Sequence, residues 1–433
     1  MNALKKQLTR LRWQDGITLG VLYYVALLPW QPVRPPLTLG LMVAGLFWLL
    51  RGEFRQKLER LRGNGPAGVL FLFWGITVLA AFYSPDKSAA STVVFRQLPL
   101  IAWPLLLGTW TDGGSTWLAK VLRWLVGAVA VVLLLALLRA AFCYLAFPHL
   151  QLFFFDYLAD GGRVPPHYLA LFTNFSYGLV LLSLLRNPPP SGRKRLFRGA
   201  LLLFFFVMLI LLSVRSQFVL FLAINAWLVG SYCWQRWGAW RTSLSLGGML
   251  LVFFGLALLL PGSRQRLDDT YAELRALRHP TAKTQTNPRV YIWQQAWKAI
   301  RENPWQGYGT GAEDAPLQQG LSTVEAQFWN GSASYTLGDR AYNYHNAYLQ
   351  RWAGQGLLGL LSLLLVFLVP VFWPGVGPWR SVQVLFLLCC GVSFATESML
   401  QRQAGLLFFS FLYALLFVYP PAYRKPPAAE KEH

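Results

Sequence analysis

Long apolar runs recur along most of this chain, and one polar stretch from 262 to 344 interrupts them. Runs of eighteen or more apolar residues are long enough to cross roughly 30 Å of hydrocarbon as helices. The pattern predicts twelve spans, at 15–31, 37–50, 66–83, 93–110, 117–147, 165–185, 197–213, 216–234, 243–261, 346–373, 380–396 and 404–420. We therefore expect an all-α polytopic membrane protein with about twelve transmembrane helices and a large helical loop between spans nine and ten.

The charge pattern orients these spans. The chain is 55% hydrophobic, 13% charged and carries a net charge of +21. Its basic residues gather at the N-terminus, in every second connection and in the tail, whereas short connections on the other side are poor in Lys and Arg. This favours cytoplasmic termini and an outer loop, and it explains the basic charge without nucleic acid. The expected division is spans 1–9 in residues 1–261, the loop in 262–344, spans 10–12 in 345–422 and a cytoplasmic tail in 423–433.

Two helices are expected inside the loop. Residues 263–278 place apolar side chains on one face, and Arg289 to Glu302 places Val290, Trp293, Trp297 and Ile300 at helical spacing. Asn303-Pro304 should end the second helix, and the glycines from 307 to 311 predict a flexible turn. Because several tryptophans suit a half-wet location, we expect the loop to lie across the membrane face.

Two residues at the outer boundary are the first candidates for chemistry. His345 opens the tenth span, where a neutral imidazole is able to take a proton from a sugar hydroxyl. Arg215 lies in the tight turn between spans seven and eight, and a guanidinium there suits a phosphate or diphosphate. The structural alternatives are an interfacial histidine and an arginine that extends to the interface.

Two further arginines are candidate anion contacts. Arg289 begins the second loop helix, where a cation is disfavoured unless an anion binds beside the free N–H groups. Arg96 lies near the outer end of the fourth span, with extension to the interface as its alternative. Glu397 and Arg402 flank the last outer turn and are interpreted as a pair with each other. The other histidines, including His167 at the start of the sixth span, carry less weight.

Several motifs are absent from the sequence. It has no Walker loop, no Asp-x-Asp motif and no Gly-x-Ser-x-Gly elbow, and its four cysteines lack zinc-like spacing. The prediction is chemistry without a metal, a nucleotide or another cofactor, so that the donor must arrive already activated.

Three motifs resemble the O-antigen ligase (WaaL) family, within the O-antigen ligase/polymerase superfamily. They are the arginine turn Ser213-Val214-Arg215-Ser216, the Arg-x-x-x-Trp helix from Arg289 with the Asn-Pro-x-x-Gly-x-Gly turn at 303–309, and His345-Asn346-Ala347-Tyr348-Leu349. The resemblance also covers the topology of the whole chain.

The resemblance implies transfer of an O-antigen glycan from undecaprenyl diphosphate to the lipid A–core, at the periplasmic face of the bacterial inner membrane. His345 would be the general base, and Arg215 and Arg289 would bind the diphosphate and stabilise its developing charge. Arg96, Tyr344, Asn346 and Trp293 complete the expected substrate-binding set. The reaction would invert the anomeric centre, and membrane lipids would surround the spans.

Other functions remain open at this point. A polymerase or a protein O-oligosaccharyltransferase of the same superfamily would share the donor but not the acceptor. A lipid or solute transporter also suits twelve spans, but the sequence shows few buried charges and no evident broken helix pair. A long tryptophan-rich loop is also atypical of transporters.

Overall fold

The computed structural model describes residues 2–30, 34–110, 113–160, 164–186, 188, 190–260, 263–264, 268, 271, 288–322, 324–327, 334–373 and 379–419. The α-helices are α1 (Asn2–Leu27), α2 (Arg34–Leu50), α3 (Phe54–Leu61), α4 (Gly65–Tyr83), α5 (Lys87–Arg96), α6 (Pro99–Gly108), α7 (Gly114–Ala146), α8 (Phe155–Asp160), α9 (Pro166–Leu185), α10 (Gly192–Leu212), α11 (Arg215–Leu259), α13 (Pro288–Glu302), α14 (Asp314–Leu321), α15 (Ala347–Phe372), α16 (Arg380–Thr396) and α17 (Gln403–Tyr413). Short 3-10 helices occupy Leu150–Phe153 and Leu337–Asp339, a π-helical turn at Ala414–Val418 follows α17, and β1 (Glu325–Gln327) pairs antiparallel with β2 (Ser334–Thr336).

The apolar helices confirm an all-α polytopic membrane protein, with the three-residue β1–β2 hairpin as an addition to the expected helices. Among the described residues, seven helices are long and apolar enough to cross a membrane, or eight if the bent pair α2–α3 counts as one span. Each of the twelve predicted segments contains a helix. Because α1, α16 and α17 have shorter apolar parts, the count of twelve stays a prediction.

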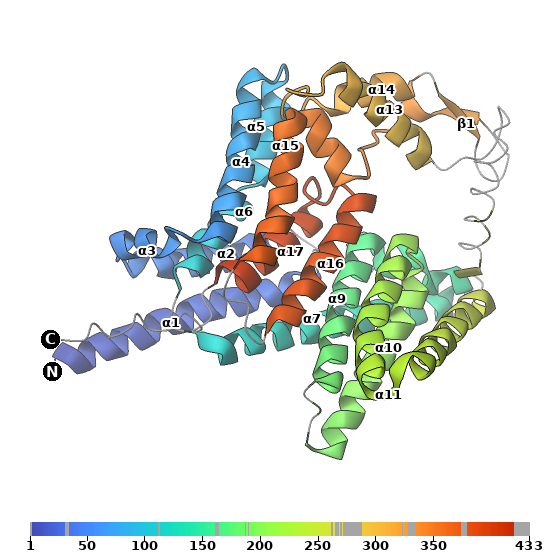
Figure 1. Cartoon of the computed structure of the whole chain (residues 1–433), viewed down its shortest axis with the longest axis horizontal. Helices are drawn as coiled ribbons and strands as arrows, with labels where there is room; N and C mark the ends of the chain where they lie inside the picture. Colours follow the sequence, from blue (N-terminus) through green and yellow to red (C-terminus); the bar gives the residue numbers. More distant parts are fainter. Residues whose placement is uncertain are drawn as a thin grey trace.

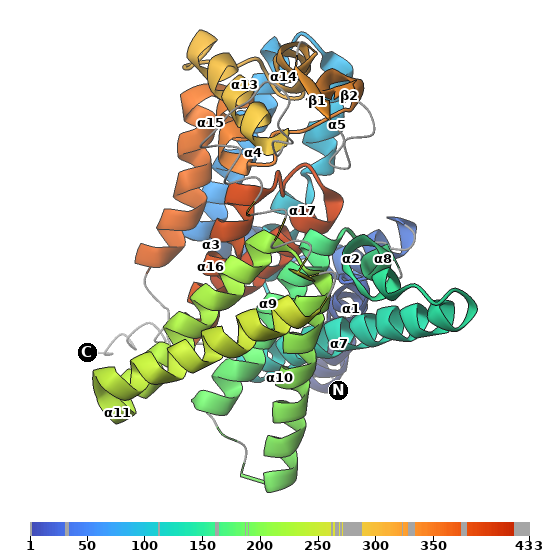
Figure 2. The same cartoon turned by 90° about the vertical axis from the view of Figure 1, so that its right-hand side faces the viewer.

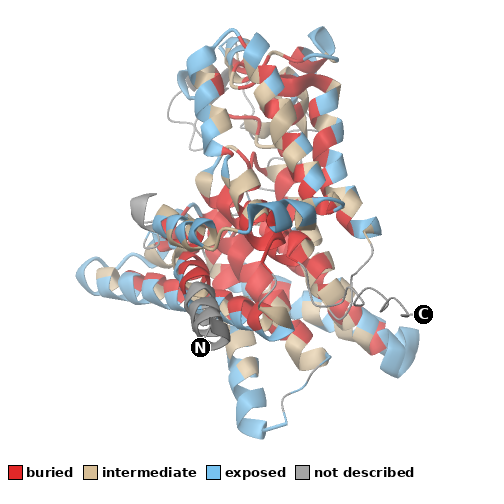
Figure 3. Cartoon of the chain, turned by 90° about the vertical axis from the view of Figure 1, so that its left-hand side faces the viewer, coloured by how far each residue is buried: buried red, intermediate tan, exposed pale blue. Residues whose placement is uncertain are grey.

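One buried helix organises the bundle. The apolar window of α9 is 78% buried, far more than that of any other long span among the described residues, and α9 packs against α7, α10, α11 and α16. Figure 3 shows the buried residues concentrated in the middle of the bundle. Elsewhere, large apolar side chains point outward, as expected where lipid replaces water.

Two spans are broken, which corrects the expectation of unbroken helices. Helix α5 ends at Arg96 and α6 begins at Pro99, whose missing N–H cannot continue the helical ladder. Helix α15 is interrupted at Gln355 and Gly356, where Gly356 has φ 62°. A third change of direction, at Gly238 with φ 73°, separates the two helical parts of α11, which correspond to predicted spans eight and nine.

The described part of the loop forms a cap on the ends of α4 and α15 (Figure 1). Helix α13 begins at Pro288 and ends at Glu302, in agreement with the predicted helix, whereas most of the other expected loop helix lies outside the described residues. The cap has a small apolar core of its own, in which Ile292, Ala296 and Ile300 of α13 meet Leu317 and Leu321 of α14.

The glycine turn after α13 is fixed to the break in α15, and is not the flexible turn expected. The backbone N–H groups of Tyr308 and Gly309 donate to the carbonyls of Ala353 and Gly354, both at 2.8 Å. Gly307 has φ 71°, and a Cβ there would lie 2.6 Å from the backbone of α15. The turn needs glycine because its backbone closely approaches the backbone of α15. The break in α15 leaves carbonyl groups free of helical hydrogen bonds, and these accept the N–H groups of the turn.

Candidate active site

His345 lies at the junction between the cap and α15, in a strained conformation. Its φ is 44°, and its backbone N–H donates to the side chain of Asn343 at 3.0 Å. Asn346 caps α15 by accepting from the N–H groups of Tyr348 and Leu349, and its amide donates to the carbonyl of Ala395 in α16. The imidazole is therefore held at a defined position against the end of α16.

Glu397, the residue that directly follows α16, joins this histidine to two other segments. Its carboxylate lies 3.2 and 3.3 Å from His345 Nδ1, 2.7 Å from Arg289 Nη2 and 3.1 Å from His167 Nε2. His167 comes from the first turn of α9 and Arg289 from the first turn of α13. One buried carboxylate thus gathers two imidazoles and a guanidinium.

The charges around Glu397 outweigh its burial. Burial alone raises the pKa of this carboxyl, but the hydrogen bond with His345 and the positive charges of His167, His345 and Arg289 lower it overall. The carboxylate is therefore ionised at neutral pH and only accepts hydrogen bonds. Since His345 Nδ1 faces it, the proton resides on Nδ1, and Nε2 keeps the lone pair that a general base needs.

Arg289 occupies a helix start where a cation is unfavourable by itself. The macrodipole of α13 opposes it, and Glu397 supplies the compensating negative charge. The sequence predicted an anion at this position, and the structure places a protein carboxylate there.

Arg215 is the first residue of α11, and its neighbour Gln217 ties this end of the helix to the site. The Gln217 amide donates to Ser393 Oγ at 3.1 Å, one turn before Glu397 in α16, and its carbonyl oxygens accept from Asn174 of α9. The role of Arg215 itself stays a prediction.

The other predicted binding residues surround this cluster. Tyr344 is fully buried and donates through its hydroxyl to the carbonyl of Glu313, and the indole N–H of Trp293 donates to the carbonyl of Tyr344 at 3.1 Å. Arg96 donates to the carbonyl of Gln401 at 2.8 Å, in the connection that follows Glu397. These contacts place Trp293, Tyr344 and Asn346 in the framework that holds His345, and their binding of substrate stays a prediction.

Sequence reasoning missed Glu397 and His167. It interpreted Glu397 as a partner of Arg402, five residues away, whereas its ion pairs run to Arg289, His345 and His167. The sequence did contain one signal for them. Both residues lie at ends of predicted spans, on the same predicted outer side of the membrane as His345.

Together these features define the class of protein. It is a multi-pass helical membrane protein with a histidine–glutamate–arginine cluster where a capping loop meets the bundle. Residues 200–364, less than half of the chain, match the family model described as O-antigen ligase. This match supports a place in the O-antigen ligase/polymerase superfamily. The match contains Arg215, Arg289 and His345, while His167 and Glu397 lie outside it.

A protein from Haemophilus influenzae (strain KW20), described as an uncharacterized protein, is 25% identical over 128 residues. That overlap covers 28% of this chain and 30% of the relative, so it is a local similarity.

Proposed function

We propose that this protein is a glycosyltransferase that moves O-antigen glycan from undecaprenyl diphosphate to the lipid A–core. The reaction takes place at the periplasmic face of the bacterial inner membrane, with both termini in the cytoplasm. The observation that carries the proposal is the convergence of His345 and Arg289 on Glu397 from distant parts of the chain. The family match supports the reaction class, and the basic connections support the orientation.

The chemistry is a single displacement. His345 Nε2 takes the proton of an acceptor hydroxyl, whose oxygen forms a bond with the anomeric carbon of the donor sugar. The bond from that carbon to the diphosphate oxygen breaks, and the electron pair leaves with the diphosphate. Attack from the opposite face inverts the anomeric centre.

The other residues of the cluster support this displacement. Glu397 keeps His345 in the Nδ1–H form and stabilises the imidazolium that forms, as the carboxylate does in a catalytic triad. Arg289 and Arg215 stabilise the charge that builds on the departing diphosphate. Since a polyprenyl diphosphate is already an activated donor, we expect no requirement for a nucleotide or an added metal.

The test is transfer with purified components. Wild-type protein and His345→Gln would each receive undecaprenyl-diphosphate-linked glycan and lipid A–core, with chelator and without nucleotide. Ligated lipopolysaccharide from wild type, and at least 10²-fold less from the folded variant, is the expected result. Lengthening of the lipid-linked glycan would instead identify a polymerase, and full activity of the variant would overturn the assigned base.

A further inference from the structure

We propose that Gln217 is a positioning residue that holds Arg215 at a fixed place relative to Glu397. The proposal rests on the transfer reaction, and on the diphosphate contact of Arg215, proposed above. Gln217 is buried, with 2% of its surface exposed, and it follows the half-buried Arg215 by two residues in the first turn of α11. An amide inside an apolar helix bundle is costly unless it is hydrogen-bonded, so its partners indicate what it does.

One link runs from Gln217 to the carboxylate of the site. The Gln217 amide donates to Ser393 Oγ at 3.1 Å, and the backbone carbonyl of Ser393 accepts the N–H of Glu397 at 2.8 Å. Ser393 alone therefore lies between the amide of Gln217 and the residue that contacts His345 and Arg289. A shift of Gln217 would reach Glu397 through one side chain and one helical turn.

A second link runs from Gln217 to α9. Asn174 Nδ2 donates to the backbone carbonyl of Gln217 at 2.9 Å and to its Oε1 at 3.1 Å. Asn174 Oδ1 accepts nothing from the described residues, so both hydrogen bonds of this amide go to Gln217. Asn174 follows His167 by seven residues, about two turns along the same face of α9. Since α9, α11 and α16 pack against one another (Figure 2), Gln217 joins the three helix ends that carry His167, Arg215 and Glu397.

The residue on the other side of Arg215 is fixed as well. Ser213 has φ 50°, a left-handed conformation that is unfavourable for serine, and its buried hydroxyl lies 2.9 Å from that of Ser263. Such strain persists only where the surrounding contacts enforce it. Arg215 thus lies in a turn whose two ends are held by buried side chains. This pre-organised arrangement is what the stabilisation of a developing negative charge requires.

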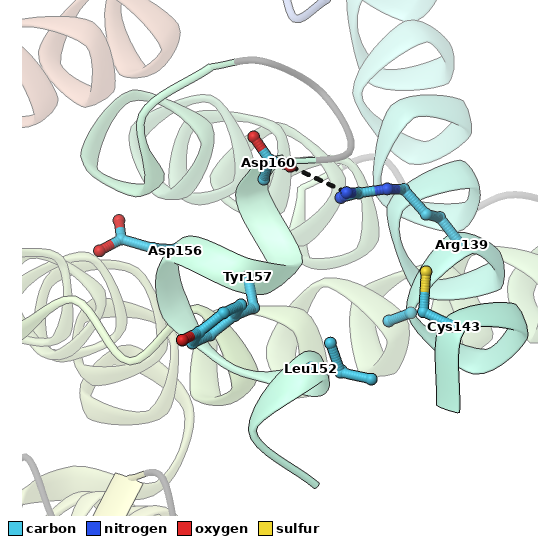
Figure 4. A pocket seen from close by; sticks show the side chains of 7 residues that line it. Arg139, Cys143, Leu152, Asp156, Tyr157 and Asp160 are labelled. Carbon is cyan, nitrogen blue, oxygen red and sulfur yellow. Dashed lines mark hydrogen bonds and ion pairs between the residues drawn. The ribbon is translucent and has the colours of Figure 1, made fainter. Parts of the chain in front are cut away.

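The alternative role for Gln217 is a simple link between helices, and the structure offers matched controls for it. Tyr177 donates to Asn225 at 2.7 Å between the same two helices, α9 and α11, about two turns deeper than Gln217. Arg139 of α7 pairs with Asp160 of α8 at 2.8 Å beside a cavity of about 320 Å³ (Figure 4). Neither pair includes a residue of the histidine–glutamate–arginine cluster.

Steady-state transfer by the full-length protein in detergent would separate these roles. Gln217→Leu should lower kcat about tenfold and change KM less than about twofold, because the guanidinium is displaced from where the leaving charge develops. Asn225→Leu and Arg139→Gln should keep the wild-type kcat. Asn225→Leu should still lower the unfolding temperature as Gln217→Leu does, since each removes a buried hydrogen bond. Equal losses of kcat in the two leucine variants would overturn the proposal.

A double variant tests whether Gln217 acts through Arg215. In an Arg215→Gln background, Gln217→Leu should lower kcat by less than about twofold, because no guanidinium is left to position. A further tenfold loss in that background would show that Gln217 acts by another route, and the proposal would be wrong.

A nitroxide label at Ser216→Cys, in a cysteine-free background, gives a readout that does not depend on transfer. Ser216 is half-buried between Arg215 and Gln217. The spectrum should show an immobilised label, which becomes mobile in Gln217→Leu and stays immobilised in Asn225→Leu. An unchanged spectrum in Gln217→Leu would overturn the proposal. A mobilised turn in a protein that transfers no glycan would contradict the transfer reaction and still show that Gln217 fixes the turn of Arg215.

Discussion

The carboxylate of Glu397 contacts side chains from three segments that are remote in sequence. It selects the Nδ1–H form of His345, compensates the charge of Arg289 at a helix start, and contacts His167. Because each effect depends on its negative charge, a neutral residue of the same shape should disable the site without removing its atoms.

Glu397→Gln should therefore lower kcat of glycan transfer on the order of 10²-fold and change KM much less. The amide cannot stabilise the imidazolium, and it can donate to His345 Nδ1 and so favour the wrong tautomer. Initial rates with purified donor and acceptor would measure this. Glu59→Gln, on the exposed face of α3, is the matched control, and a fully active Glu397→Gln would refute the role.

The two histidines at Glu397 should differ in importance. His167 Nε2 is already within 3.1 Å of Glu397 and 3.3 Å of Arg289, whereas only His345 Nδ1 is engaged with the carboxylate. We expect His167→Gln to reduce the transfer rate less than tenfold, and His345→Gln at least 10²-fold. The reverse order in the same assay would move the general base to His167.

At the scale of elements, the break in α15 and the turn at 303–309 form one joint. The turn donates to carbonyls that the break leaves free, and the indole N–H of Trp352 donates to the carbonyl of Pro304 at 2.9 Å. This joint holds the cap on the bundle, and with it Arg289 above α16.

Gly307→Ala should weaken the joint. The added Cβ would lie 2.6 Å from the α15 backbone, and φ 71° is strained for alanine. We expect a loss of about 1–3 kcal/mol of stability, seen as a lower unfolding temperature in detergent. Gly127→Ala in α7, where a Cβ meets open space, is the control and should not be destabilised. Equal unfolding temperatures for wild type and Gly307→Ala would argue against a tight joint.

Glu313 makes the cap sensitive to pH. Burial, together with the neighbouring charge of Asp314, raises the pKa of this carboxyl to about 7, above its ordinary value of 4.5. Between these values the unfolded chain releases its proton while the folded protein keeps it. Stability should therefore fall as pH rises from about 4.5 to 7 and stay lower above that range.

Glu313→Gln should remove this pH-dependent loss of stability, because the amide that replaces the carboxyl is neutral at every pH. The variant should have a higher unfolding temperature than wild type at pH 8, with a smaller difference between the two proteins at pH 5. Glu302→Gln, at the exposed end of α13, should leave the pH profile unchanged. A Glu313→Gln profile parallel to that of wild type would show that Glu313 is ionised in the folded protein.

At the scale of the whole molecule, α4 separates the basic connection from the cap. Helix α3, with its arginines, precedes the start of α4, and the hydroxyl of Thr310 in the cap donates to the carbonyl of Thr77 near the other end. If α4 spans the bilayer, these features lie on opposite sides of it (Figure 1).

Single cysteines in a cysteine-free background would test the orientation. Gln319→Cys in α14 should react with an impermeant maleimide in cells with a permeabilised outer membrane. Gln56→Cys in α3 should react only after the inner membrane is broken. Both positions are exposed, so access alone decides labelling. The opposite pattern would place the cap in the cytoplasm and exclude a periplasmic reaction.

The sequence by itself determined the helices and the first candidates of the site. Apolar length and the helical spacing of apolar residues act locally, so they are visible in a linear chain. His345 and Arg289 stood out because polar residues at the ends of apolar segments are costly without a purpose.

Only the tertiary structure decided which residues meet. Glu397 lies 52 residues from His345 and 108 from Arg289, and nothing local to Glu397 distinguishes these partners from nearby Arg402. The break in α15 likewise became visible only with the turn that fills it, because a Gln-Gly pair inside an apolar run has no strong local signal. Long-range pairing depends on how helices pack, and that packing places His345, Glu397 and Arg289 in one cluster.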